Sequence, residues 1–100
     1  MTNVKTSLDL KPNDIREMKG RLHHLKPTVI LGNKGLTDEV LNEINNELNH
    51  KELIKIRTIA NGSEELMTIA EEICAKTKAI LIQTIGHIIA IYRKNLQVEE

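Results

Sequence analysis

Apolar residues recur at steps of three and four in three stretches of the chain, which is the spacing of one buried helix face. The first stretch starts at Pro12, a residue suited to the first position of a helix. Thr37 precedes the second stretch and Ser63 the third, and both side chains can cap a helix N-terminus. The apolar positions are Ile15, Met18, Leu22 and Leu25, then Val40, Leu41, Ile44 and Leu48, then Leu66, Ile69, Ala70, Ile73 and Cys74. The pattern predicts three helices that each turn one face to a core.

Short runs rich in β-branched and aliphatic residues lie between and after these stretches, and such runs favour strands. Residues 28–31 and 53–59 are the first two runs, and residues 79–85 and 88–93 are the last two. Gly86-His87 joins the last pair, and a two-residue connection that begins with glycine fits a type II′ hairpin. The predicted order is therefore αβαβαββ, a compact α/β fold of one domain.

The faces of the predicted strands follow from the alternation of side chains along a strand. In the strand over 53–59, Ile54 and Ile56 point one way, and Lys55 and Arg57 point the other. Both faces of the last hairpin are mostly apolar, so we expect helices to cover both of its sides, at least in part. One face collects Leu81, Gln83, Ile85, Ile88, Ala90 and Tyr92, and the other collects Ile80, Ile82, Thr84, Ile89, Ile91 and Arg93.

Length and composition fit one globular domain. The chain has 100 residues, of which 40% are hydrophobic and 28% charged, and no apolar run approaches the roughly 18–20 residues of a membrane helix. A single cysteine rules out an internal disulfide, and with only four scattered histidines beside it a structural zinc site is not expected. The first residues lack the apolar block of a signal peptide, so we expect a cytoplasmic protein. We place the domain at residues 10–95, between an N-terminal tail (1–9) and a C-terminal tail (96–100).

The net charge is zero, but the charges are unevenly placed. Residues 1–35 hold seven Lys or Arg and three acids, whereas residues 36–50 hold four acids and no Lys or Arg. The fold can therefore have a basic face and an acidic face, although alternating charges also arise because exposed surfaces need solvating. Tyr92 is the only aromatic residue, which largely excludes base stacking on an aromatic platform.

Gly32-Asn33-Lys34-Gly35, the GxxG loop, is the strongest candidate for chemistry because it lies between a predicted strand and a predicted helix N-terminus. Two glycines let the backbone approach a ligand with no Cβ in the way. The helix behind them directs unsatisfied N–H groups and a partial positive charge at the loop, and Lys34 adds a full charge. These parts make a phosphate cradle, and a GxxG loop is how KH modules clamp a nucleic-acid backbone. The same residues are also compatible with a plain tight turn.

Two further groups of basic residues have two interpretations each. The first predicted helix directly precedes the strand of the GxxG loop, so its C-terminal end can lie near the loop and bind phosphate. Its charges can equally complement the helix dipole. Lys55 and Arg57 can extend a basic surface or protect an edge strand against unwanted pairing. The members of the helix group are Lys19, Arg21, His23, His24 and Lys26.

No arrangement of residues supports catalysis. The loop lacks the GK[ST] ending of a Walker motif and the GxGxxG pattern of dinucleotide folds. Cys74 falls on the apolar face of a predicted helix, which favours a small core residue over a nucleophile. Spacing supports neither a nucleophile with its base nor a carboxylate pair. We therefore expect no enzyme activity, no cofactor and no metal.

Several runs of residues together carry a family resemblance. They are Met18-Lys19-Gly20, the run from Leu25 to Thr37, the run from Glu52 to Ile56, the run from Gln83 to His87, and Ile91-Tyr92-Arg93. Over residues 10–94 the chain resembles the CRM domain, the chloroplast RNA-splicing and ribosome-maturation domain. The stand-alone bacterial form of this domain is the YhbY-type RNA-binding protein.

The resemblance implies a mixed four-stranded sheet packed with helices, similar to the C-terminal domain of translation initiation factor three. It also implies RNA binding without catalysis, with Gly32, Asn33, Lys34 and Gly35 as the RNA-contacting loop. Basic residues at positions that are commonly basic in the family are Lys19, Lys26, Lys55 and Arg93. The chain departs from the family at His24, where we expect proline, and at its acidic ending Glu99-Glu100, where many relatives carry basic tails.

The resemblance implies a cellular role as well. Stand-alone bacterial members associate with precursors of the large ribosomal subunit, and plant relatives act in group II intron splicing. A ribosome-assembly factor of this kind would bind ribosomal RNA or a pre-ribosomal particle, and no membrane or small-molecule substrate. Without aromatic stacking, phosphate contacts and RNA shape should dominate over base identity. The alternative is a protein–protein adaptor that docks basic ribosomal proteins through its acidic helices.

Overall fold

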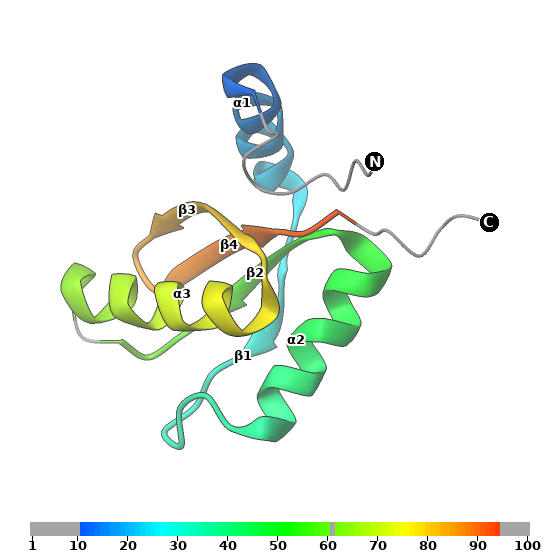
Figure 1. Ribbon diagram of the computed structural model, residues 1–100. Coiled ribbons are helices and arrows are strands. Elements are labelled where there is room, and N and C mark those ends of the chain that lie inside the picture. Colours follow the sequence, from blue (N-terminus) through cyan, green and yellow to red (C-terminus); the bar gives the residue numbers. More distant parts are fainter. Residues whose placement is uncertain (1–10, 61, 95–100) are drawn as a thin grey trace.

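The computed structural model describes residues 11–60 and 62–94, and it confirms the predicted order αβαβαββ with one added 3₁₀ turn (Figure 1). The predicted tails (1–9 and 96–100) and the domain boundaries next to them lie outside the described residues. The elements are α1 (Pro12–Arg21), η2 (Leu22–His24), β1 (Pro27–Ile30), α2 (Asp38–Lys51), β2 (Leu53–Arg57), α3 (Ser63–Thr77), β3 (Ile80–Ile85) and β4 (Ile88–Tyr92).

The four strands form one mixed sheet in the order β1-β2-β4-β3. β1 and β2 are parallel, and their connection through α2 is the crossover that parallel strands require. The other two pairings are antiparallel, with β4 between β2 and β3. Gly86 has φ +60°, which suits the first loop residue of the predicted type II′ hairpin.

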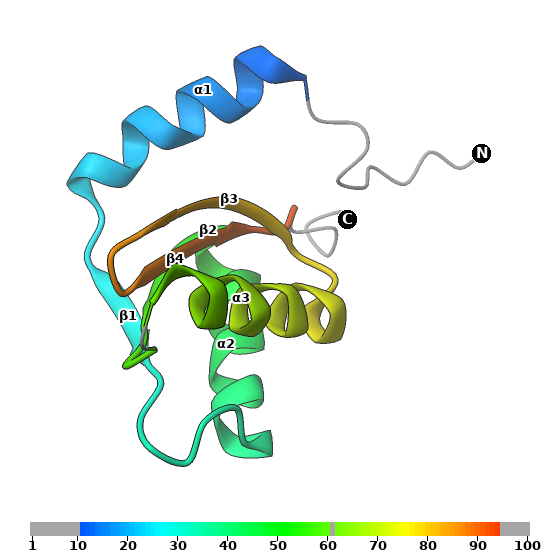
Figure 2. The same cartoon turned by 90° about the vertical axis from the view of Figure 1, so that its left-hand side faces the viewer.

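Helices cover both faces of the sheet, as the apolar hairpin predicted (Figures 1 and 2). α2 and α3 pack on one face, and α1 packs on the other. Full burial of one large aliphatic side chain stabilises a fold by roughly 1.5–3 kcal/mol, so each face contributes substantially. The core under α2 and α3 is made by Val29, Ile44, Leu48, Ile54, Ile56, Ala60, Leu66, Ala70, Ile73, Ile89 and Ile91. The smaller core under α1 is made by Met18, Leu22, Leu53, Ile82 and Ala90.

A β-bulge in β3 corrects the predicted faces of the hairpin. Leu81 pairs with Ile91, and the next paired residue is Gln83, so Ile82 is an extra residue in the ladder. Leu81 therefore packs against the core under α2 and α3, and Ile82 packs against the core under α1. The sequence alternation places these two residues on the opposite faces, because a regular hairpin has no extra residue to shift the register.

The N-terminus of α2 has the predicted cap, and that of α3 does not. The Val40 N–H donates to Thr37 Oγ1 at 3.2 Å, which satisfies one of the free donors at the start of α2. The prediction that Ser63 caps α3 is wrong, because Ser63 is already the first helical residue and Gly62 occupies the capping position. Gly62 has φ +99°, a conformation that side chains rarely adopt, and it turns the chain into the helix one residue early.

Candidate nucleic-acid interface

The GxxG loop is a tight turn at the C-terminal end of β1. The Gly35 N–H donates to the Gly32 carbonyl oxygen at 3.0 Å, and the Thr37 N–H donates to the Gly35 carbonyl oxygen at 3.1 Å. These two bonds fold the chain between β1 and α2 and leave Asn33 and Lys34 exposed at the tip. The loop therefore presents one ammonium group and a short stretch of open backbone to solvent.

Both ends of the loop are fixed to the rest of the fold. Leu31 is buried, and its N–H donates to the Arg57 carbonyl oxygen at 2.7 Å, which extends the pairing of β1 with β2 by one residue. On the other side Leu36 packs against the core under α2 and α3, and Thr37 caps α2. A loop held at both ends loses less conformational entropy when it binds a ligand than a free loop of the same length.

The two glycines of the loop differ in what the fold requires of them. Gly35 has φ +73°, in the region where a side chain is strained, so the turn itself favours glycine there. Gly32 does not have a positive φ, and apart from the glycine and its two chain neighbours no described atom lies within 4 Å of the place where its Cβ would be. The fold would accept a side chain at Gly32, and its absence leaves the loop backbone open on that side.

Two acids lie at the helix end beside the loop. Asp38 and Glu39 are exposed in the first turn of α2, where a carboxylate stabilises the helix through its dipole. The same carboxylates repel an incoming phosphate. The full charge of Lys34, rather than the helix N-terminus alone, must then supply the attraction in a phosphate cradle.

The basic residues of the first helix do not lie next to the loop. α1 and η2 lead into the N-terminal end of β1, and the loop follows its C-terminal end (Figures 1 and 2). At about 3.3 Å per residue the four residues of β1 separate the two by roughly 13 Å. Our expectation that the helix end lies near the loop is therefore wrong, because an extended strand carries the chain away. The exposed basic residues of this region are Lys19, Arg21, His23, His24 and Lys26.

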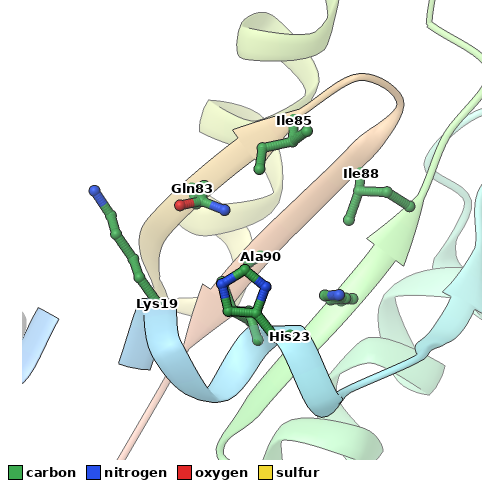
Figure 3. A pocket seen from close by; sticks show the side chains of 8 residues that line it. Lys19, His23, Gln83, Ile85, Ile88 and Ala90 are labelled. Carbon is green, nitrogen blue, oxygen red and sulfur yellow. The ribbon is translucent and has the colours of Figure 1, made fainter. Parts of the chain in front are cut away.

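The structure instead places part of this basic group over the sheet, beside β2. A hollow of about 150 Å³ lies between the helix and the sheet, and Figure 3 shows His23 above β4 at Ala90. Lys55 also borders the hollow, and its Nζ donates to the Leu25 carbonyl oxygen at 3.0 Å, which ties the end of η2 to β2. Ile54 and Ile56 pack in the core under α2 and α3, and Lys55 lies on the opposite face, as predicted. Alternation places Arg57 on the same face as Lys55, which is the α1 side. The lining residues are Lys19, Leu22, His23, Lys55, Gln83, Ile85, Ile88 and Ala90.

Arg93 is engaged inside the protein. Its guanidinium donates to Asn45 Oδ1 at 2.7 Å and to the Thr77 carbonyl oxygen at 2.8 Å. It also donates to the Asn45 carbonyl oxygen at 3.2 Å and to Asn49 Oδ1 at 2.8 Å. Burial lowers the pKa of Arg93 from its usual value. These contacts bind the end of β4 to α2 and α3, on the side of the sheet away from α1.

Sequence reasoning did not single out Gln83, Ile85 and Ile88 as surface residues. Their position follows from the hairpin register, which pairs Ile85 with Ile88 and Ile88 with Arg57. Arg57 is exposed and points to the α1 side, so its neighbours on the same face could have been expected at the surface near the end of α1. That expectation requires knowing which strands pair with each other. The sequence of one strand does not reveal its partner, so the surface position of these three residues could not be predicted from the sequence alone.

The described residues hold neither a metal centre nor a reactive thiol. Within residues 11–60 and 62–94, no group of three or more His, Cys, Asp or Glu could hold a metal ion. Cys74 packs against the core under α2 and α3, and burial raises the pKa of its thiol to about 11. In the same part of the chain, no helix is both long and apolar enough to cross a membrane.

Comparison with known proteins identifies the family. The CRS1/YhbY (CRM) domain matches residues 10–93, almost the whole chain. The chain belongs to the CRS1/YhbY (CRM) domain family. The resemblance found in its loop and strand runs is thereby confirmed, and the GxxG loop and the hollow both lie within the matched residues.

Several bacterial proteins are similar to this chain over most of their length. An "RNA-binding protein" of Haemophilus influenzae is 50% identical over 76 residues, which cover 76% of this chain and 77% of that protein. The "Probable RNA-binding protein YqeI" of Bacillus subtilis is 32% identical over 87 residues, covering 84% and 91% of the two chains. The solution structure of the hypothetical protein SAV1595 from Staphylococcus aureus matches with a TM-score of 0.78 at 27% identity, covering 90% and 94%. The CRM-type α/β fold is therefore shared.

Proposed function

We propose that this protein binds RNA and grips the RNA backbone with the GxxG loop. The observation that carries the proposal is the open backbone at Gly32, where the fold has room for a side chain and the sequence has none. Lys34 lies exposed next to it and can pair with a phosphate, and the loop is held in place at both ends. Family membership and the names of the relatives support the same ligand.

Each residue of the loop has a distinct role in this proposal. Gly32 lets a sugar–phosphate chain approach the backbone, and Gly35 closes the turn that presents the tip. Lys34 supplies the charge, and the amide of Asn33 can donate to a phosphate oxygen. The proposed role is binding alone, without a reaction on the RNA and without a cofactor, in line with the names of the relatives.

A second set of basic side chains orients the RNA in this proposal. Lys19 and Lys26 are exposed on and after α1, and Lys55 lies partly buried at the hollow. One of the three donors of the Lys55 ammonium goes to Leu25, so this residue acts partly as a structural tie. We leave Arg93 out of the RNA surface, since its guanidinium is used between α2, α3 and β4.

Gly32→Asp tests the loop more cleanly than a change at Gly35, where positive φ would add strain. It places a side chain and a negative charge at the open backbone, and we expect RNA affinity to fall at least about tenfold with an unchanged melting temperature. Asn46→Asp is the matched control, because it adds the same charge at an exposed position well along α2. Equal RNA affinity of Gly32→Asp and wild type would remove the loop from the site.

We further infer that the protein acts in the cytoplasm on precursors of the large ribosomal subunit, as stand-alone members of its family are expected to do. The test is to fractionate a lysate on a sucrose gradient and to locate the protein by antibody. We expect it with large-subunit precursor particles, and to move to the top of the gradient in the Gly32→Asp variant. An unchanged position of Gly32→Asp with loss of association in Glu43→Gln would favour the adaptor that docks through acidic helices.

A further inference from the structure

One row of side chains crosses all four strands on the α1 side of the sheet. The register pairs Ile30 with Arg57, Arg57 with Ile88, and Ile88 with Ile85. Val29, next to Ile30, points into the core under α2 and α3, so alternation places Ile30 on the opposite side. At about 4.8 Å between neighbouring strands, the row runs for roughly 14 Å from β1 to β3.

α1 leaves this row uncovered. The helix packs over Leu53, Ile82 and Ala90, which lie toward the other end of the sheet. In the row, Ile30 remains 66% exposed and Ile85 remains 63% exposed. Figure 3 shows Ile85 and Ile88 beyond the helix, toward the turn between β3 and β4. Two large aliphatic side chains exposed on the same row are a feature that folding alone does not require.

The surroundings of the row are basic. Arg57 lies inside it, and Lys19, His23 and Lys55 border the hollow that Ile85 and Ile88 also line. None of the eight residues that line this hollow is acidic. Two acids lie away from the row: burial first, and then the charges of Glu52 and Asp14, raise the pKa of Tyr92, which is at the opposite end of β4 from Ile88.

The row also connects the two regions of the proposed function. Only Leu31 separates Ile30 from the GxxG loop, and Ile85 and Ile88 line the hollow beside α1. A ligand that leaves the loop toward α1 along the sheet must therefore pass over the isoleucines and Arg57. An apolar strip with cations along it is complementary to a chain of flat apolar groups joined by phosphates.

We propose that a single-stranded RNA segment lies across this row, between the GxxG loop and the hollow, with its bases on Ile30, Ile85 and Ile88 and its phosphates beside Arg57 and Lys55. The inference rests on the proposed RNA binding and specifies its substrate class. Only unstacked bases can offer their faces to the isoleucines, because the bases of a duplex are stacked inside the helix. The Arg57 guanidinium can pair with a phosphate or stack on a base, and the Gln83 amide can donate to or accept from a base edge.

The test measures the affinity of the protein for two RNAs. One is a short single-stranded oligoribonucleotide that cannot pair with itself, and the other is the duplex that this strand forms with its complement. The variant is Ile30→Ala with Ile85→Ala, and both positions are exposed, so circular dichroism and the melting temperature should stay as in wild type. We expect its affinity for the single strand to fall about tenfold and its affinity for the duplex to remain unchanged. The matched control is Met67→Ala, because Met67 is a 41% exposed apolar residue on α3, one of the two helices on the other face.

Four outcomes separate this inference from the proposed function. A selective loss of single-strand binding in the double variant supports it. If the double variant binds the single strand like wild type while Gly32→Asp does not, the row is unused and the loop proposal stands. If wild type binds neither RNA, the proposed function itself fails. If poly-L-glutamate, but not the single strand, shifts the amide resonances of Ile30, Ile85 and Ile88, the row docks an acidic protein and the inference is wrong.

Discussion

At the scale of single residues, Arg93 shows how one guanidinium can hold two helices and a strand together. Thr77 is the last residue of α3, so its carbonyl oxygen has no partner within the helix, and Arg93 supplies a donor to it. The same group bonds Asn45 and Asn49 on α2, which places a positive charge near the negative ends of both helix dipoles. The residue therefore stabilises the fold at a place that sequence alone marks only as basic.

We predict that Arg93→Lys is destabilising although it keeps the charge. A lysine ammonium cannot reach the four acceptor atoms on two helices at once, so partly buried acceptors lose their donor, and the free energy of unfolding should fall by about 1–3 kcal/mol. Urea unfolding followed by circular dichroism measures this loss. Lys76→Arg, an exchange between the same two residue types at an exposed position of α3, is the control and should change stability little. A stability equal to wild type would show that the contacts of Arg93 contribute nothing net.

We predict that Cys74 reacts slowly with iodoacetamide in the folded protein. Burial raises its thiol pKa from 9.0 to about 11, so at pH 8 the thiolate is about a hundredfold rarer than in the unfolded chain. The folded state holds the proton more tightly, so this residue's contribution to stability is complete below pH 9 and is lost as the pH rises through 11. Mass spectrometry with and without urea compares the two rates. Equal rates would mean that the thiol is open to solvent.

At the scale of elements, α2 combines a helix start suited to an anion with two carboxylates that oppose one. Thr37 satisfies one N–H group of the first turn, whose other N–H groups have no acceptor within the helix. Asp38 and Glu39 are exposed at the same end. These two acids stabilise the helix. Because they also repel an anion, they make the loop beside the helix a weaker anion site. The balance between the two effects can be shifted by one substitution.

We predict that Asp38→Asn strengthens RNA binding and weakens the fold. Removing the first-turn carboxylate should lower stability by about 0.3–1 kcal/mol and raise RNA affinity by a factor of roughly two to five at low salt, which is the same energy in the opposite direction. Glu71→Gln, the same change of charge at an exposed position of α3, is the control. Fluorescence anisotropy gives the affinity. A decrease in affinity would show that the Asp38 carboxylate accepts a hydrogen bond from the RNA rather than repelling its phosphates.

The elements were predictable to the extent that local rules determine them. Three helices and four strands follow from periodicity, and the Thr37 cap follows from residue type. The bulge at Ile82 and the glycine cap at Gly62 do not, because a bulge is a property of two paired strands and the cap depends on an unusual φ.

The site was predictable in the same way. The GxxG loop is contiguous in sequence, so its residues could be named in advance. The row across the sheet and the internal contacts of Arg93 join residues from separate elements, and only the tertiary pairing brings them together.

At the scale of the whole molecule, the proposed RNA contacts are spread over one side of the fold and should release several counterions. With four or five of Lys19, Lys26, Lys34, Lys55 and Arg57 on phosphate, the slope of log K against log salt should be roughly −3 to −4. Lys34→Ala should weaken binding similarly for all sequences and make the slope less steep by roughly 0.7–0.9. Lys76→Ala is the control. Affinity independent of salt would contradict the phosphate-led interface and favour the adaptor.

The position of β4 has a consequence for when the protein can fold during its synthesis. β4 is the last strand of the described residues and one of the two interior strands of the sheet, and it contributes Ile89 and Ile91 to one core and Ala90 to the other. During synthesis the N-terminal parts emerge first, so neither core can close until residues 88–92 have left the ribosomal exit tunnel. A chain that stops at residue 87 should show little protection of its β2 amides in hydrogen exchange. A nascent copy would thus gain its stable shape only after β4 has emerged and can enter the sheet.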